Sequence, residues 1–275
     1  MPTRPLPIGV VTDEISRSLP EALEIAQSWG LSRFELREGG ERRFPALTPD
    51  EVAAVDAVLR DGGQVTAVSP GIFKGHADDE AAIRTALEET LPRTLDLAAR
   101  FGCPLVIVFG FERYAGEPEA NRARAMAAFE RAADLAADAG MRVAVENEPD
   151  FWIDRPAASA ALLDEVGHPA LALNWDPANL HWGGRRPTRA DLDAVLSHLA
   201  NLHVKDYRSG HPEAPWAPVG EGETPWADLL PRVQSASALD HVTLETHCVP
   251  LVESSRRSLE ALRQLLADAT APASP

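Results

Sequence analysis

Four side chains that could bind a metal stand near the ends of four apolar segments in the second half of the chain. They are Glu146, Asp176, His203 and Glu245. Each follows a run rich in Val, Leu or Ala, which is typical of a buried strand. Three carboxylates and one imidazole suit Mn²⁺, Mg²⁺ or Co²⁺ better than a sulfur-rich zinc site does. The residues therefore predict a divalent metal site, with Mn²⁺ as the first choice and Mg²⁺, Co²⁺ or Zn²⁺ as the other candidates.

The position of each residue within its segment supports a common centre. Alternate residues of a strand point to opposite faces, so each candidate shares a face with residues two positions away. These neighbours are Glu148, Asn174, Lys205, Thr243 and His247. One strand-end carboxylate is usually a solvated or structural group, but four candidates in matching positions favour a shared site. Without a cation, the carboxylates would repel each other in a restricted space.

Strand-like and helix-like segments alternate along the whole chain. The expected strands are 8–12, 33–37, 64–69, 105–109, 142–149, 171–176, 201–206 and 241–247. The expected helices are 19–29, 48–61, 79–101, 117–139, 157–166, two that begin at 188 and 224, and 253–267. Eight alternations predict an α/β fold, a single (β/α)8 TIM barrel domain over residues 1–275, with a frayed tail at 270–275. An open doubly wound sheet is the alternative, but it would not gather the strand ends around one point.

Composition limits the partners and the compartment. The 275 residues fit one barrel, which typically needs about 250. A net charge of −16 and a pI near 4.9 disfavour binding to nucleic acid or to an anionic membrane. Two cysteines are too few for a disulfide framework, and the first seven residues lack an apolar signal core. We expect a cytoplasmic protein that acts on a small molecule.

The motifs around the four metal candidates resemble those of the sugar phosphate isomerase/epimerase family, the xylose isomerase-like TIM barrels. The motifs are Val-Glu-Asn at Glu146, Trp-Asp-Pro-Ala-Asn at Asp176, His-Val-Lys-Asp at His203 and Leu-Glu-Thr at Glu245. The resemblance covers nearly the whole chain and implies that these four residues bind the metal. In the family's ketose 3-epimerases the two glutamates also form the acid/base pair. Endonuclease IV shares this fold, but its site needs further histidines that have no counterpart here.

A reaction follows from this resemblance as a hypothesis. The metal would bind a ketone oxygen and a neighbouring hydroxyl of a sugar or polyol, and Glu146 or Glu245 would remove the proton between them, giving an enediolate. Return of the proton gives a ketose 3-epimerase or an aldose–ketose isomerase, whereas loss of a hydroxyl gives a dehydratase of the inosose dehydratase type. Lys205 is a third catalytic candidate, as a general acid, or else a structural partner of Glu35 or Glu148. A non-catalytic or hydrolytic metal-binding barrel is a further alternative.

Seven other residues are candidates for contacts with the substrate. They are Glu35, Lys74, Glu148, Asn179, His181, His247 and Trp216. Trp216 lies in the long loop 208–223, and the flexible Gly220-Glu-Gly222 stretch makes this loop the best candidate for a lid. We expect Arg37 to pair with Glu35, and Asp206 to hold a neighbouring helix or loop. Family members are often dimers or tetramers, so the resemblance also makes a homo-oligomer a candidate assembly.

Overall fold

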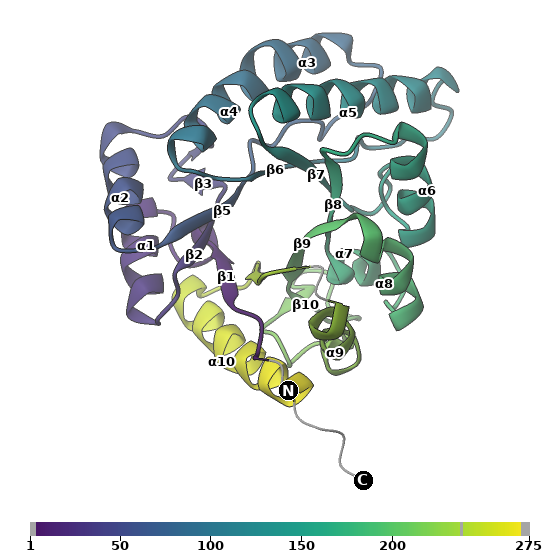
Figure 1. Cartoon of the computed structure of the whole chain (residues 1–275). Coiled ribbons are helices and arrows are strands. Elements are labelled where there is room, and N and C mark those ends of the chain that lie inside the picture. The colour runs from purple at the N-terminus through teal and green to yellow at the C-terminus, as the bar shows by residue number, and fades with distance from the viewer. Residues whose placement is uncertain (1–3, 237–238, 271–275) are drawn as a thin grey trace.

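Eight parallel strands close into a barrel in this computed structural model, which describes residues 4–236 and 239–270. Their order around the barrel is β1-β12-β9-β8-β7-β6-β5-β2, and the helices surround them (Figure 1). The strands are β1 Ile8–Val11, β2 Arg33–Leu36, β5 Gln64–Val68, β6 Leu105–Val108, β7 Arg142–Glu146, β8 Leu171–Trp175, β9 Leu199–Val204 and β12 Val242–Leu244. The single (β/α)8 TIM barrel predicted from the sequence is confirmed.

Apart from α7, which was not predicted, the helices begin and end close to the predicted positions. They are α1 Leu19–Ser28, α2 Pro49–Arg60, α3 Glu80–Thr85, α4 Leu91–Arg100, α5 Ala120–Asp138, α6 Pro156–Val166, α7 Pro177–Trp182, α8 Arg189–Val195, α9 Trp226–Ala236 and α10 Leu251–Thr270. The start of α2 shows why such signals work. The Thr48 hydroxyl accepts a hydrogen bond from the Glu51 backbone N–H, and the Glu51 carboxylate accepts one from the Thr48 N–H. Both otherwise unpaired donors are thereby satisfied.

Several predicted segments need correction. The expected helix 79–101 is interrupted by a π-helical turn at Ala86–Thr90, just before Pro92, which cannot donate a backbone hydrogen bond. The loop 208–223 is also more ordered than expected, because β10 Asp206–Tyr207 pairs with β11 Trp216–Ala217. A second hairpin, β3 Glu38–Gly39 with β4 Arg42–Arg43, follows β2. At the carboxyl end, Thr270 completes α10, and residues 271–275 lie outside the described part.

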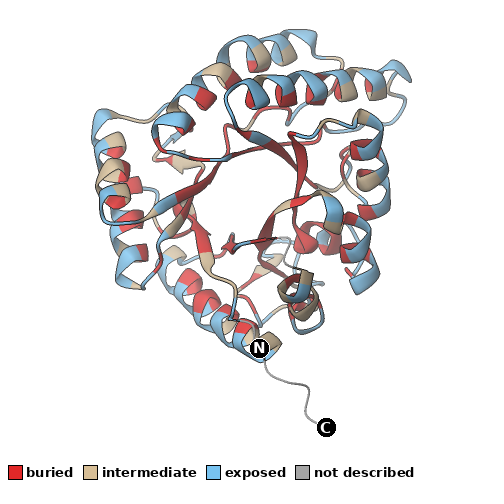
Figure 2. Ribbon diagram, in the orientation of Figure 1, coloured by how far each residue is buried: buried red, intermediate tan, exposed pale blue. Residues whose placement is uncertain are grey.

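The barrel interior has an apolar layer and a polar layer. Ala67, Leu105, Ile107, Ala144 and Ala172 form a buried apolar cluster of their own, separate from the larger core. Ala144 pairs with Ala172 across β7 and β8, and two residues further Glu146 pairs with Asn174. The alternation of the strands thus places polar groups above small apolar ones on the same interior face. Figure 2 shows the buried strands and the buried inner faces of the helices.

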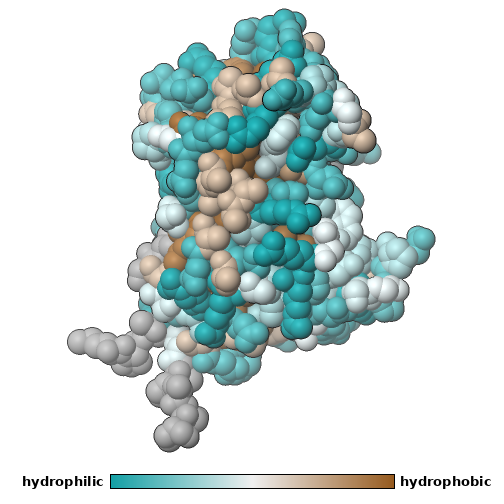
Figure 3. Space-filling model, turned by 90° about the vertical axis from the view of Figure 1, so that its right-hand side faces the viewer, coloured by the Kyte–Doolittle hydropathy of each residue, from teal (hydrophilic) through white to brown (hydrophobic). Residues whose placement is uncertain are grey.

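The face of the molecule seen in Figure 3 is mostly hydrophilic. Figure 3 shows a band of apolar residues between hydrophilic ones on one side of the molecule. Among the described residues, the helices are too short or too polar to cross a bilayer. Cys103 and Cys248 are both buried and unbonded to each other.

Candidate metal centre

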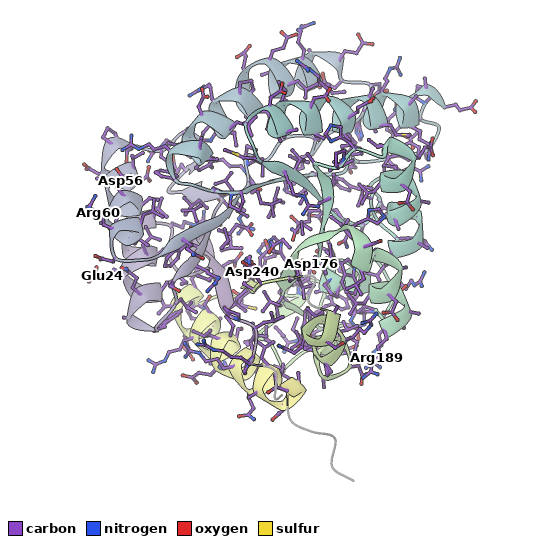
Figure 4. All side chains as sticks on the ribbon, viewed as in Figure 1. Glu24, Asp56, Arg60, Asp176, Arg189 and Asp240 are labelled. Carbon is purple, nitrogen blue, oxygen red and sulfur yellow. The ribbon has the colours of Figure 1, made fainter. Side chains whose placement is uncertain are left out.

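The four predicted ligands come together at the carboxyl ends of β7, β8, β9 and β12. Each of Glu146, Asp176, His203 and Glu245 offers one ligand atom, and these atoms lie within 4.8 Å of one another. All four residues are buried. Figure 4 shows Asp176 near the barrel axis, whereas Asp56 and Arg60 lie on the outer side of the helices.

His203 stands between carboxylates on both edges of its ring. Its Nδ1 lies 3.1 Å from Oε1 of Glu146 and 3.3 Å from Oε2 of Glu245. Its Nε2 lies 2.9 Å from Oε2 of Glu35. Burial alone would lower the pKa of His203, but the carboxylates of Glu35, Glu245 and Glu146 raise it well above its usual value. The ring therefore presents Nδ1 to the cluster, and Glu35 fixes its orientation through the contact with Nε2.

Lys205 provides a second positive charge within the cluster. Its Nζ lies 2.8 Å from Oδ2 of Asp176 and 3.0 Å from Oε2 of Glu245. Burial would lower the pKa of Lys205, but these two carboxylates raise it above its usual value, so the side chain is a fixed ammonium. The expected structural partners, Glu35 and Glu148, are thus wrong: Lys205 pairs with two of the metal-ligand candidates.

The residues present fit a divalent cation. Oδ1 of Asp176 caps α7 by accepting hydrogen bonds from the N–H groups of Ala178 and Asn179. Oδ2 of Asp176 is buried and makes no hydrogen bond among the described residues, and the Lys205 ammonium lies 2.8 Å from it. Burial raises the pKa of Asp176, as expected for a carboxylate that needs a positive partner. Glu146, Asp176, Glu245 and Nδ1 of His203 would hold the metal, in a mostly oxygen set.

A chain of polar groups supports this cluster from inside the barrel. The Thr243 hydroxyl donates to Oδ1 of Asn201, and Nδ2 of Asn201 donates to Oε2 of Glu35, at 3.0 and 3.3 Å. Glu35 then contacts His203. Partners of this kind fix the orientation of a metal-binding imidazole. Glu35 was predicted to contact substrate, and the structure makes it a partner of His203 that also lines the cavity.

Arg37 orients Glu245 from the other side. Its guanidinium donates to Oε1 of Glu245, to Oε1 of Glu14 at 2.7 Å and to Oδ2 of Asp13 at 2.6 Å. The expected pairing of Arg37 with Glu35 is therefore wrong. His247 joins this network, with Nδ1 2.9 Å from Oε1 of Glu14. Burial would raise the pKa of Glu14, but His247 and Arg37 lower it to about 2.

Asp13 and Glu14 were not among the predicted site residues. The signal for them was in the sequence, because they directly follow the first expected strand, and the ends of barrel strands open on one face.

A cavity of about 190 Å³ opens above the cluster. Its lining includes Glu35, Lys74, Glu148 and His247, four of the seven predicted substrate contacts. Burial and the charge of Glu146 raise the pKa of Glu148 to about 7.

A wider hollow of about 1100 Å³ is lined by Lys74, Glu148, Asn179, Trp216 and His247, among others. Asn179 also donates to the backbone oxygen of Asn147. His181 is the exception, because it lines neither space and packs against the ring of Tyr207.

The loop that carries Trp216 is tied down at its base. The Asp206 carboxylate accepts hydrogen bonds from the N–H groups of Gly220, Gly222 and Thr224. A Cβ at Gly222 would come within 2.4 Å of Oδ1 of Asp206, so glycine allows this close approach. The prediction that Asp206 holds a neighbouring loop is confirmed, and the expected flexibility of Gly220-Glu-Gly222 is not. The Trp216 ring contacts the Trp182 ring, and its centre lies 4.6 Å from Nζ of Lys205.

Comparison with known proteins places this barrel in a family. A family model described as xylose isomerase-like TIM barrel matches residues 23–265. The chain belongs to the xylose isomerase-like TIM barrel family. The resemblance predicted from the four motifs is thereby confirmed.

One curated relative and two solved structures are similar to this chain. A 2-epi-5-epi-valiolone 7-phosphate 2-epimerase from Actinoplanes sp. is 26% identical over 219 residues, which is 78% of either chain. A probable 3-DHS dehydratase of Bacillus anthracis, involved in petrobactin synthesis, has a TM-score of 0.78 at 18% identity, covering 94% of this chain and 99% of that one. A D-allulose 3-epimerase from Methylomonas sp., in complex with D-allulose, has a TM-score of 0.74 at 18% identity, covering 96% and 99%. The two structures share the fold with this chain.

Proposed function

We propose that this protein is a divalent-metal-dependent sugar isomerase or epimerase, and that it works by moving a proton on a carbon next to a carbonyl group. One observation carries the proposal: Glu146 and Glu245 meet at the same buried cluster from strands that are not neighbours in the barrel. Two carboxylates that reach one centre from different sides suit removal of a proton on one face and its return on the other. The Actinoplanes and Methylomonas relatives, both named epimerases, support the same class of reaction.

The surroundings of the two glutamates suggest different roles. A divalent cation would polarise the carbonyl group and acidify the adjacent C–H. Glu146 has only His203 as a side-chain partner among the described residues, so it is the freer base. Both oxygens of Glu245 are held, Oε1 by Arg37 and Oε2 by Lys205. We assign proton removal to Glu146 and proton return to Glu245, and both carboxyl groups would exchange protons with solvent between turnovers. The Lys205 ammonium, 3.0 Å from Oε2 of Glu245, would keep that carboxylate in place.

Exchange of substrate protons with solvent tests this proposal. The Mn²⁺-loaded protein is incubated with a panel of ketoses in D₂O, and NMR follows deuterium incorporation next to the carbonyl. We expect exchange with at least one ketose, and a fall of about 10²–10⁴-fold in Glu146→Gln, because a positioned base contributes about that much. Circular dichroism should show the variant folded.

Glu112→Gln is the matched control, since Glu112 lines only the wider hollow. It should exchange at the wild-type rate. Exchange at that rate in Glu146→Gln, or no exchange with any ketose in the wild type, would contradict the proposal. A product that has lost water would instead indicate a dehydratase, as the Bacillus anthracis relative is named.

A further inference from the structure

The cavity above the metal cluster has two chemically different sides. The residues of the cluster that line it come from β7, β9 and β12. Another part of its wall is built by the β3–β4 hairpin and by the segments that follow β5 and β6, and it contains Arg43, Ser69, Lys74 and Phe109. In the barrel, β2, β5 and β6 form an arc next to that of β7, β8, β9 and β12. One side thus collects the carboxylates of the cluster. The other side contains two cations, Arg43 and Lys74, and one carboxylate, Glu38, which pairs with Arg43.

The Arg43 guanidinium uses only some of its N–H donors within the described residues. Its Nε donates to the backbone oxygen of Ser69 and its Nη2 to the Ser69 hydroxyl, at 3.1 and 3.0 Å. Its Nη1 makes one long contact with Glu38, at 3.3 Å. A guanidinium has five N–H donors, so one on each terminal nitrogen has no partner among the described residues. A Cβ at Gly71 would lie 2.6 Å from Nε, so this glycine lets the loop after β5 hold the guanidinium in place.

Lys74 carries a charge that no neighbour neutralises. Within residues 4–236 and 239–270 it makes no ion pair or hydrogen bond, and its Nζ lies 4.5 Å from the centre of the Phe109 ring. The guanidinium carbon of Arg43 is 5.7 Å from the same ring centre. Lys74 is thus an exposed cation that lines the cavity, in a chain of net charge −16. Arg37, by contrast, is already paired with three carboxylates.

We propose that Arg43 and Lys74 form a subsite for an anionic oxygen group of the substrate, a carboxylate or a phosphate. The substrate would then be an acidic keto-polyol. This inference rests on the proposed function, because it assumes that the reacting carbonyl lies at the metal cluster. A forked guanidinium with two vacant donors and a nearby ammonium suit such a group. The carboxylates on the other side would repel the anion and so orient the substrate with its carbonyl toward the metal.

Binding of simple anions tests the subsite without turnover. Inorganic phosphate and acetate are titrated into the Mg²⁺-loaded protein by calorimetry. Lys74→Met keeps an unbranched side chain against Phe109 but removes the charge, and Lys74 is exposed, so the variant should fold. We expect it to bind phosphate about tenfold more weakly, the usual effect of losing one charged hydrogen bond.

Arg42→Met is the matched control for binding. Arg42 belongs to the same hairpin as Arg43 but donates to Glu51 and to the backbone of Ala46. This variant should bind phosphate as the wild type does. Equal affinity in Lys74→Met and the wild type would mean that phosphate binds the metal alone, and would overturn the proposal. Failure of both anions to bind the wild type would overturn it too.

Three matched cyclic hydroxyketones, one neutral, one with a carboxylate and one with a phosphate ester, separate this proposal from the proposed function. We expect kcat/KM to be at least about tenfold higher for an anionic substrate than for the neutral one. Whichever of the carboxylate and the phosphate ester has the higher kcat/KM identifies the group that the subsite binds. Lys74→Met should remove this advantage mainly through KM. If the neutral ketone reacts as well as the others, the subsite is wrong while the proposed function stands. If none reacts, the proposed function fails, and the phosphate titration alone decides on the subsite.

Discussion

The two layers of the barrel interior share strands β7 and β8 but are stabilised in different ways. In the lower layer, Ala144 and Ala172 lie in register and pack with Ile107. Two residues further along, Glu146 and Asn174 also lie in register, and there the interior is filled by charges. The lower layer gains stability from excluding water, whereas the upper layer buries charged groups at a cost that only their partners offset. A step of two residues therefore separates the part that stabilises the fold from the part that performs chemistry.

Removing Lys205 should have the largest effect on stability, and only when no metal is bound. Lys205→Met leaves Asp176 and Glu245 buried without the ammonium that lies within 3.0 Å of both. We expect the free energy of unfolding of the metal-free protein to fall by about 3–5 kcal/mol, the usual cost of breaking a buried ion pair. Saturating Mn²⁺ should recover a large part of this loss, because the ion supplies the missing charge. Thermal unfolding with and without Mn²⁺ measures both; an equal loss in the two conditions would contradict the electrostatic explanation.

Ile107→Ala provides the counterpart in the lower layer. Ile107 is fully buried, so its truncation should lower the free energy of unfolding by about 2–5 kcal/mol through lost contacts and a residual cavity. No charge is involved, so the loss should be the same with and without Mn²⁺. Urea denaturation in both conditions measures it. A deficit that Mn²⁺ repairs here would show that the two layers are not energetically distinct.

Much of this division could be predicted from the sequence, because it depends on alternation within strands. The positions of Glu146, Asp176, His203 and Glu245 at strand ends follow from local periodicity alone. The partners of Arg37 do not, because Asp13, Glu14 and Glu245 come from two strands far apart in sequence that meet only when the barrel closes at β1 and β12. The choice between Asp176 and Glu148 as partners of Lys205 also depends on distances in space that a sequence does not contain.

The short helix α7 was missed for a different reason. Asp176 followed by Pro177 carries the usual start signals of a helix, a capping carboxylate and a proline in the first turn. The same residues also belong to the Trp-Asp-Pro-Ala-Asn motif of the metal site. The structure shows that Asp176 serves both purposes, with Oδ1 capping the helix and Oδ2 facing the cluster. A residue with two roles is difficult to assign from its spacing, because either role accounts for it.

Glu35→Gln should affect the upper layer alone. Glu35 contacts Nε2 of His203 from below the cluster, and its loss should weaken Mn²⁺ binding by about 10–100-fold, as is typical for partners of a metal ligand. Calorimetric titration with Mn²⁺ gives the affinity. The neutral amide is nearly isosteric, so the fold should persist. Unchanged Mn²⁺ affinity would indicate that the contact between Glu35 and His203 does not contribute to metal binding.

Thr243→Val should have the smallest effect and shows where one layer ends and the other begins. The Thr243 hydroxyl is buried and donates to Oδ1 of Asn201, which in turn donates to Glu35. Valine keeps the shape but leaves Oδ1 without this donor, so we expect a loss of about 0.5–1.5 kcal/mol in the free energy of unfolding. Mn²⁺ affinity should change by less than in Glu35→Gln, because Thr243 is two hydrogen bonds further from His203. A change in Mn²⁺ affinity as large as that of Glu35→Gln would extend the charged layer down to Thr243, and would make the polar chain a single unit with the metal site.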